Sequence, residues 1–478
     1  MLIREKVLVT GFGLGLSLRQ PLDLILTTWQ FDFRFEILFE ILFEILFQIL
    51  FQILFQIFLL STRTVHSINK HKTMVRRRGR QGRQGQNIGR TILYRGALMA
   101  VAVALGSRKH FQNLFPSPEG ICQTDDAVET VFGKVNPCDF FSETYLEARS
   151  KFRQAAKDAG AELVSLQIYQ NYTTEIAYLQ SESTDLVVHT SGVHGIEGYA
   201  GSAVQIALLK NIPATKRPSV LLIHAVNPHG MAHYRRVNEN NVDLNRNGLH
   251  DFDKVNKRDP NMAGYVDFDA SFNPTQPFRY GFFGELLPKL WEHGLNKLKT
   301  AMVSGQYHKA TGIFYGGTQL EASNQKMYDF MKEFLQTHPV KGKTTWINLH
   351  TGLGKSGMDT ILLLDKSCKE NVSHVFNESL VPGATGGDDV QDGYHMMQGA
   401  TEDLMQPLLS QQDWIVTQEF GTKSSIWVGR ALILENMQYN HLEKASKILR
   451  SAFYPRTPEW RQSILTRGLR VLQQAMER

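Results

Sequence analysis

Strand-like and helix-like patterns of apolar residues alternate from about Pro118 to the end of the chain. Residues 145–160 place apolar side chains at helical spacing and end in glycine, a common helix terminator, and residues 199–210 predict a second helix. Strands alternating with helices favour an α/β fold, with three α/β/α layers around a mixed, largely parallel central sheet. Short, continuously apolar runs predict the buried strands, at residues 186–190, 220–226, 345–349, 360–364 and 414–417.

The first 117 residues follow a different pattern. Residues 35–58 repeat FEIL or FQIL almost without change, and three glutamates in the first half of this repeat argue against a membrane span. We therefore exclude residues 1–73 from the fold, as a low-complexity leader that need not belong to the mature protein. The main domain is expected at residues 118–478.

Residues 74–117 have the composition of a targeting segment. An Arg-rich, acid-free stretch after Met74 precedes an apolar run, an order that suits an organelle transit peptide or a signal peptide equally. The uninterrupted apolar part, Ala97 to Leu105, is too short for a membrane span. We expect an organelle-targeted or secretory protein rather than a plainly cytosolic one, with membrane association only through this leader.

The charge of the chain is unevenly distributed. The net charge is +6, yet residues 45–117 contain twelve Lys or Arg and no Asp or Glu, so the remainder carries −6. The basicity thus belongs to the leader, and we expect no nucleic-acid binding by the main domain. Three cysteines cannot form a disulfide scaffold; we expect three thiols, with one Cys122–Cys138 bridge as the alternative.

Candidate chemistry follows the predicted strands directly. After residues 186–190 comes SGVHGIEGYAG, which places His194 and Glu197 three residues apart between glycines. An imidazole nitrogen and a carboxylate oxygen both suit zinc. One such pairing is expected by chance in a chain with 16 His, so a polar loop is the alternative at this point.

The loop after residues 220–226 is rich in groups that bind anions. Residues 227–247 contain three Arg and six Asn. A guanidinium can hold a carboxylate with two parallel hydrogen bonds, so this loop suits the anionic end of a substrate. A solvated polar loop is the alternative.

Two further residues complete a candidate site. His350 follows residues 345–349 and makes a set of two imidazoles and one carboxylate, which leaves the fourth position of zinc open, as in catalytic sites. Glu419 follows residues 414–417 and is the only carboxylate in residues 415–429. A carboxylate there suits general acid/base chemistry on an attacking water.

The ordered motifs HGIE at 194–197, RVNENNVDLNR at 236–246, LHTG at 349–352 and QEFG at 418–421 resemble the zinc carboxypeptidase superfamily. Within it, GVHGIEGYAGSA and RRVNENNVDLNRN most resemble a branch catalogued as a domain of unknown function. The likeness runs from about Val135 to His441.

This resemblance implies a role for each matching residue. One zinc per chain would be bound by His194, Glu197 and His350, and Glu419 would be the general acid/base. Of the remaining residues, Arg236 would stabilise the oxyanion with Arg235 as a competitor, Asn245 and Arg246 would hold the substrate carboxylate, and Tyr394 would match a mobile tyrosine with imperfect spacing.

The resemblance implies a zinc hydrolase that cleaves an amide bond next to a free carboxylate, on peptide or N-acyl amino acid substrates. Carboxypeptidase action is the first hypothesis, and deacylation of an N-acyl amino acid is the second. A non-catalytic binding protein on the same fold is the rival from another class. Residues 249–343 depart from the family pattern, and would either cap the cleft or form ordinary surface helices.

Overall fold

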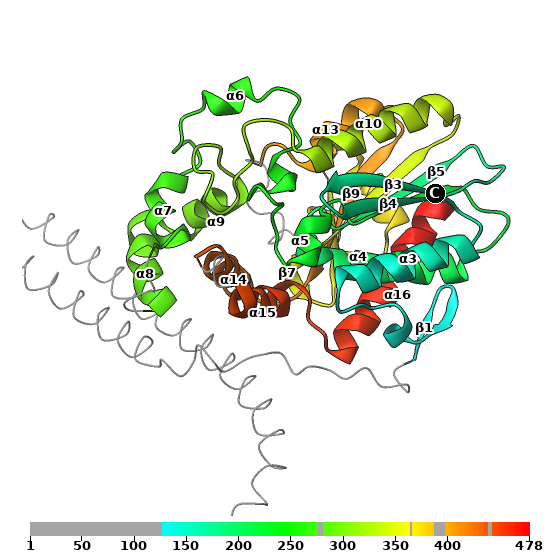
Figure 1. Cartoon of the computed structure of the whole chain (residues 1–478), viewed down its shortest axis with the longest axis horizontal. Helices are drawn as coiled ribbons and strands as arrows, with labels where there is room; N and C mark the ends of the chain where they lie inside the picture. Colours follow the sequence, from blue (N-terminus) through cyan, green and yellow to red (C-terminus); the bar gives the residue numbers. More distant parts are fainter. Residues whose placement is uncertain (1–126, 276–280, 364–365, 387–396, 438–441) are drawn as a thin grey trace, which may run out of the picture. The chain divides into compact units, whose positions relative to one another are not determined.

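The computed structural model describes residues 127–275, 281–363, 366–386, 397–437 and 442–478 (Figure 1). The expected leader, residues 1–73 and 74–117, lies outside these ranges. Among the residues that the structure describes, no helix combines the length and apolar character that a membrane span requires.

Seven strands of the described chain form one mixed sheet, which confirms the expected fold class. The four central strands are parallel to one another, and the outer strands run antiparallel to their neighbours. In spatial order the strands are β3 (Glu162–Tyr169), β4 (Tyr172–Leu179), β6 (Ser219–His224), β5 (Leu186–Ser191), β7 (Thr344–Ser356), β9 (Trp414–Gly421) and β8 (Asp359–Leu363).

Helices cover both faces of the sheet and make the expected three layers (Figure 1). On one face, α3 (Tyr145–Asp158), α4 (Gly198–Asn211) and α16 (Pro458–Glu477) pack with alternate strand residues such as Val187 and Leu222. On the other, α10 (Ala322–Thr337) and α13 (Thr401–Met405) pack with Val188 and Trp346. Because both faces are buried, the central strands read as continuous apolar runs.

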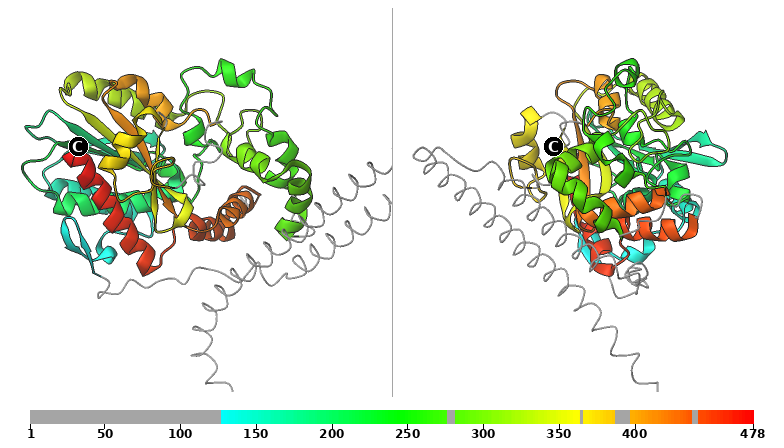
Figure 2. Two further views of the ribbon diagram at one scale, coloured as in Figure 1. Left: turned by 180° about the vertical axis from the view of Figure 1, so that it is seen from behind. Right: turned by 90° about the vertical axis from the view of Figure 1, so that its left-hand side faces the viewer.

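The remaining elements flank this sandwich. Helices α7 to α9 lie beside the sheet rather than over its faces in Figure 1 and in the left-hand view of Figure 2. Helices α7 to α9 are thus helices at the side of the domain, whereas α10, also within residues 249–343, covers one face of the sheet. The flanking elements are β1 (Val128–Thr130), β2 (Gly133–Val135), α5 (Pro228–Ala232), α6 (Asp253–Asn256), α7 (Tyr265–Phe272), α8 (Gly281–His293), α9 (Leu295–Val303), α11 (Lys369–Val375), α14 (Ser425–Met437) and α15 (Leu442–Phe453).

The predicted elements are present with small changes at their ends. The helix predicted at 145–160 is α3, which begins at the Thr144 cap and ends before Gly160, whose φ is +73°. The five predicted strands are β5, β6, β7, β8 and β9. Sequence analysis missed the β3–β4 hairpin, whose outer strand is half exposed and so lacks a continuous apolar run.

One expectation about the cysteines is wrong. Cys138 is disulfide-bonded, although three thiols were expected. Cys368 is reduced and partly buried, and Cys122 lies outside the described residues.

Candidate metal and carboxylate site

The parallel strands bring the candidate residues to one edge of the sheet. The turn Gly195–Glu197 follows β5, the Arg- and Asn-rich loop follows β6, and β7 and β9 carry His350 and Glu419. These positions share the edge because the carboxyl ends of parallel strands meet there. The turn after β5 is tight: a Cβ at Gly195 would lie 2.1 Å from the carbonyl carbon of Gly230, so only glycine fits.

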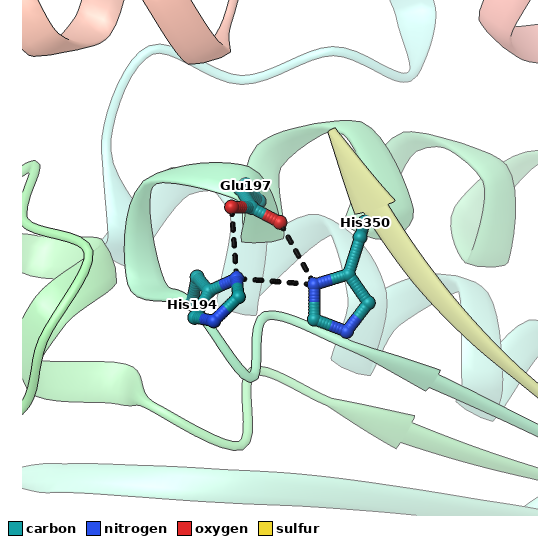
Figure 3. Close-up of side chains that lie close together, drawn as sticks. All are labelled: His194, Glu197 and His350. Carbon is teal, nitrogen blue, oxygen red and sulfur yellow. Dashed lines mark hydrogen bonds and ion pairs between the residues drawn. The ribbon is translucent and has the colours of Figure 1, made fainter. Parts of the chain in front are cut away.

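His194, Glu197 and His350 converge on one point (Figure 3). The Nδ1 atoms of the two imidazoles lie 3.1 Å apart, and the Glu197 Oε1 and Oε2 lie 2.8 Å from His194 Nδ1 and 3.0 Å from His350 Nδ1. All three side chains are buried. Two imidazole nitrogens and one carboxylate, both ligand types that zinc prefers, thus lie in direct contact with one another.

This donor set fits a zinc ion. Ligand atoms about 2.0–2.2 Å from a tetrahedral zinc lie roughly 3.3–3.6 Å from one another, close to the observed spacing. Burial opposes ionisation of Glu197, but the adjacent imidazoles of His194 and His350 hold the pKa of its carboxyl below the usual range. The Thr351 amide also donates to Glu197 Oε2 at 3.0 Å, which favours the carboxylate form that a metal ligand needs.

Asp243 orients the site, a role that sequence analysis did not assign. Its Oδ1 lies 3.1 Å from His194 Nε2 and accepts the Asn245 amide at 3.0 Å, and its Oδ2 accepts Arg236 Nε at 2.9 Å. Metal-binding histidines are commonly fixed by such a carboxylate. Burial would raise the pKa of Asp243, yet Arg236 and His194 hold it well below the usual range. The position of Asp243 inside the DLNR motif is the sequence signal that could have indicated this role.

The two adjacent arginines point to different places. Arg236 extends into the site, where its Nη1 lies 3.4 Å from Glu197 Oε1. Arg235 instead donates its Nε to Glu435 Oε1 at 2.5 Å and its Nη2 to Asn241 Oδ1 at 2.9 Å. The structure therefore brings Arg236 to the candidate ligands, and directs Arg235 towards α14.

Asn245 and Arg246 lie on the short turn after Asp243. The Thr401 amide, at the start of α13, donates to Asn245 Oδ1 at 3.0 Å, so the side-chain oxygen of Asn245 is engaged and its Nδ2 is the group that can donate to a ligand. Arg246 Nη1 donates to the backbone carbonyl of Asn245 at 2.8 Å, which fixes the Arg246 side chain to the same turn. Their buried, donor-rich arrangement suits a bound carboxylate.

Glu419 faces the candidate ligands from the neighbouring strand. It lies opposite His350 in the β7–β9 register, and its Oε1 accepts the Leu353 amide at 2.9 Å. Burial, with repulsion from Glu197, raises the pKa of Glu419 to about 7. A carboxyl group with that pKa can both take and return a proton near neutral pH. The predicted Tyr394 lies outside the described residues.

The roles of these residues stay predictions, while the comparisons with known proteins identify the family. The sequence model of the family described as "Protein of unknown function (DUF2817)" matches residues 141–467, in agreement with the branch that the motifs indicated. A search of curated protein sequences gave no match.

Several solved structures are similar over most of the chain. Bovine thrombin-activatable fibrinolysis inhibitor is 13% identical with a TM-score of 0.37, covering 66% of this chain and 96% of that chain. Carboxypeptidase A from Helicoverpa armigera is 11% identical with a TM-score of 0.38, covering 81% of each chain. Murein-tripeptide amidase MpaA from Escherichia coli O157 is 15% identical with a TM-score of 0.30, covering 59% of this chain and 94% of that chain. Similarities this low establish neither an activity nor a substrate.

Proposed function

This chain belongs to the DUF2817 family, and we propose that it is a zinc-dependent hydrolase that cleaves an amide bond next to a free carboxylate. The observation that carries the proposal is the convergence of His194 Nδ1, His350 Nδ1 and the Glu197 carboxylate within one buried cluster. Anion-binding side chains and a buried carboxyl group next to this cluster support a hydrolytic role over a purely structural metal.

Substrate orientation follows from the carboxylate-binding pair. The Arg246 guanidinium and the Asn245 amide nitrogen would hold the free carboxylate of the substrate. Asn245 cannot turn its oxygen towards that carboxylate, because the oxygen accepts the Thr401 amide. The pair therefore selects a substrate end that carries negative charge, which a peptide C-terminus and an N-acyl amino acid both provide. Carboxypeptidase action is our first assignment.

The chemical step would use two more side chains. When bound by His194, Glu197 and His350, zinc supplies a Lewis acid that polarises the scissile carbonyl and makes water more acidic. Glu419 would accept a proton from the attacking water and pass it to the leaving nitrogen, a role that suits its buried position opposite His350. Arg236, oriented by Asp243, would place positive charge where the carbonyl oxygen becomes negative.

Hydrolysis of a matched substrate panel tests this proposal. The panel pairs N-acyl amino acids and short peptides with the same compounds carrying a C-terminal carboxamide. We expect the purified chain with zinc to hydrolyse the free acids in preference to the carboxamides, and the Glu419→Gln variant to bind zinc but lose hydrolysis. A folded, zinc-loaded protein that hydrolyses no member of the panel, or treats acids and carboxamides alike, contradicts the proposal.

We also propose that the protein acts in an oxidising, secretory compartment. The disulfide at Cys138 supports this location, since disulfides persist mainly in secreted and lumenal proteins. Fractionation of cells that express the full chain tests it: the protein is expected with lumenal markers, and recovery with cytosolic or mitochondrial matrix markers contradicts it.

A further inference from the structure

Residues 304–321, here called the 304–321 loop, are hydrogen-bonded to the turn that carries the anion-binding side chains. The Asp243 amide donates to the Tyr315 carbonyl at 2.7 Å, within the motif that orients His194. The loop and the turn thus form one unit, although they are far apart in the sequence. Further bonds include those from Asn247 Nδ2 to the Gly316 and Gln319 carbonyls, from Asn241 Nδ2 to the Ala310 and Gly312 carbonyls, and from Tyr307 Oη to the Arg246 carbonyl.

Phe314, in the middle of this loop, lies against both arginines of the site. Its ring centroid is 5.5 Å from Arg236 Cζ and 5.9 Å from Arg246 Cζ. Both distances fall within the range in which a guanidinium is attracted to the negative face of an aromatic ring. The ring is buried, as is Arg246, so water screens these contacts only weakly.

The backbone at Phe314 is also unusual. Its φ is +57°, in the left-handed region that bulky residues rarely adopt. The conformation is held from both sides, because the Gln306 amide donates to the Phe314 carbonyl at 3.0 Å and the Gly316 amide donates to the Gln306 carbonyl at 2.8 Å. Strain that surrounding bonds maintain in this way is concentrated at functional sites.

Space is also reserved for the Arg246 side chain. Gly305 has a φ of +74°, and a Cβ there would lie 2.7 Å from Arg246 Cδ. The loop therefore leaves room for the Arg246 aliphatic stem at Gly305 and presents an aromatic ring near its guanidinium. These two features act on the same side chain from different positions of the loop.

We propose that Phe314 is a positioning residue that holds Arg236 and Arg246 against one aromatic ring, and so fixes the preference for a substrate with a free carboxylate. Each guanidinium group lies within 5.9 Å of the ring centroid, so attraction to the ring helps to hold both in place despite their like charge. Both cations then point in fixed directions before substrate arrives. The inference rests on the proposed function, because it assigns Arg246 to the substrate carboxylate and Arg236 to the scissile carbonyl.

The test compares Phe314→Leu, which keeps apolar volume but removes the aromatic face, with Phe314→Tyr, which keeps the face. The readout is the ratio of kcat/KM for a free-acid substrate to kcat/KM for its carboxamide. We expect this ratio to fall about tenfold in Phe314→Leu, and to stay within about twofold of wild type in Phe314→Tyr. Phe334→Leu is the matched control: Phe334 is equally buried, but lies on α10 under the opposite face of the sheet, and its loss should not change the ratio.

A binding measurement separates this inference from the proposed function. N-acetylglycine is titrated into each variant and followed by NMR, with thermal unfolding as the check on folding; Phe314→Met replaces Phe314→Leu if the latter does not fold. Wild type that does not bind this probe contradicts the proposed function itself. Wild type that binds it, with Phe314→Leu binding as tightly and keeping the acid-to-carboxamide ratio, overturns the role of Phe314 alone. An equal loss of the ratio in Phe334→Leu also overturns it.

Discussion

Replacement of Asp243 by Asn tests the orientation of the site most sharply. The two oxygens of Asp243 accept from His194 Nε2, the Asn245 amide and Arg236 Nε. Asn has one acceptor oxygen and one donor nitrogen. If the oxygen keeps the two bonds of Oδ1, the new NH₂ group faces Arg236 Nε, donor against donor. The substitution is nearly isosteric, so it removes charge and one acceptor without creating a cavity.

The expected magnitudes come from the contacts that are lost. Loss of a carboxylate that orients a metal-binding histidine typically weakens metal affinity about 10–100-fold, or about 1.4–2.7 kcal/mol. Misdirection of Arg236 should cost a further factor of about 10²–10³ in kcat/KM, the usual effect of losing an oxyanion-stabilising donor. Zinc affinity is measured by competition with a chromogenic chelator, and kcat/KM is measured at saturating zinc so that the two effects separate.

Glu175→Gln is the matched control for this experiment. Glu175 is also a fully buried carboxylate that accepts from arginine, here Arg149 Nε at 2.7 Å and Arg153 Nη1 at 2.6 Å, but it lies on β4 away from the site. We expect the control to lower stability without changing zinc affinity. Wild-type zinc affinity and activity in a folded Asp243→Asn protein would refute the orienting role of Asp243.

Two further predictions follow from the buried carboxylates. Glu419→Gln should lower kcat by about 10²–10⁴ with zinc content unchanged; activity near wild type would exclude Glu419 as the proton-transfer group. Glu175→Gln should destabilise the fold by about 2 kcal/mol near neutral pH, because hydrogen bonds from Ser165, Thr173 and Arg149 hold the pKa of Glu175 below its usual range despite burial. That contribution is present above about pH 4.5 and is lost as pH falls through the lowered pKa, so urea unfolding should show the wild-type advantage shrink on acidification. An advantage independent of pH would contradict this pairing.

The sequence predicted best those site residues that directly follow a strand. His194 and Glu197 share one turn, and His350 and Glu419 follow apolar runs, so the rule that parallel strands meet at one edge was enough to place them together. The same reasoning gave the layers and the central strands, because strands buried on both faces read as continuous apolar runs.

The sequence did not predict features that depend on contacts between residues far apart in the chain. Arg235 and Arg236 are adjacent, and the sequence does not show which of the two enters the site. Arg235 is directed away from the site by its bond to Glu435, which lies 200 residues further on. The contact of Phe314 with Arg236 and Arg246 depends on a loop whose own pattern carries no motif. The β3–β4 hairpin was missed because the half-exposed edge strand β3 mixes polar and apolar residues, and the buried strand β4 contains the polar run at residues 173–175.

Zinc stoichiometry tests the central proposal most directly. Elemental analysis of the purified chain is compared with the Glu197→Ala variant, which removes one of the three converging ligands. We expect about one zinc per wild-type chain and a large loss in the variant, with both proteins folded by circular dichroism. Equal metal content in the two proteins, or no zinc in folded wild type supplied with the ion, would contradict the assignment of this cluster as a zinc site and the hydrolase proposal with it.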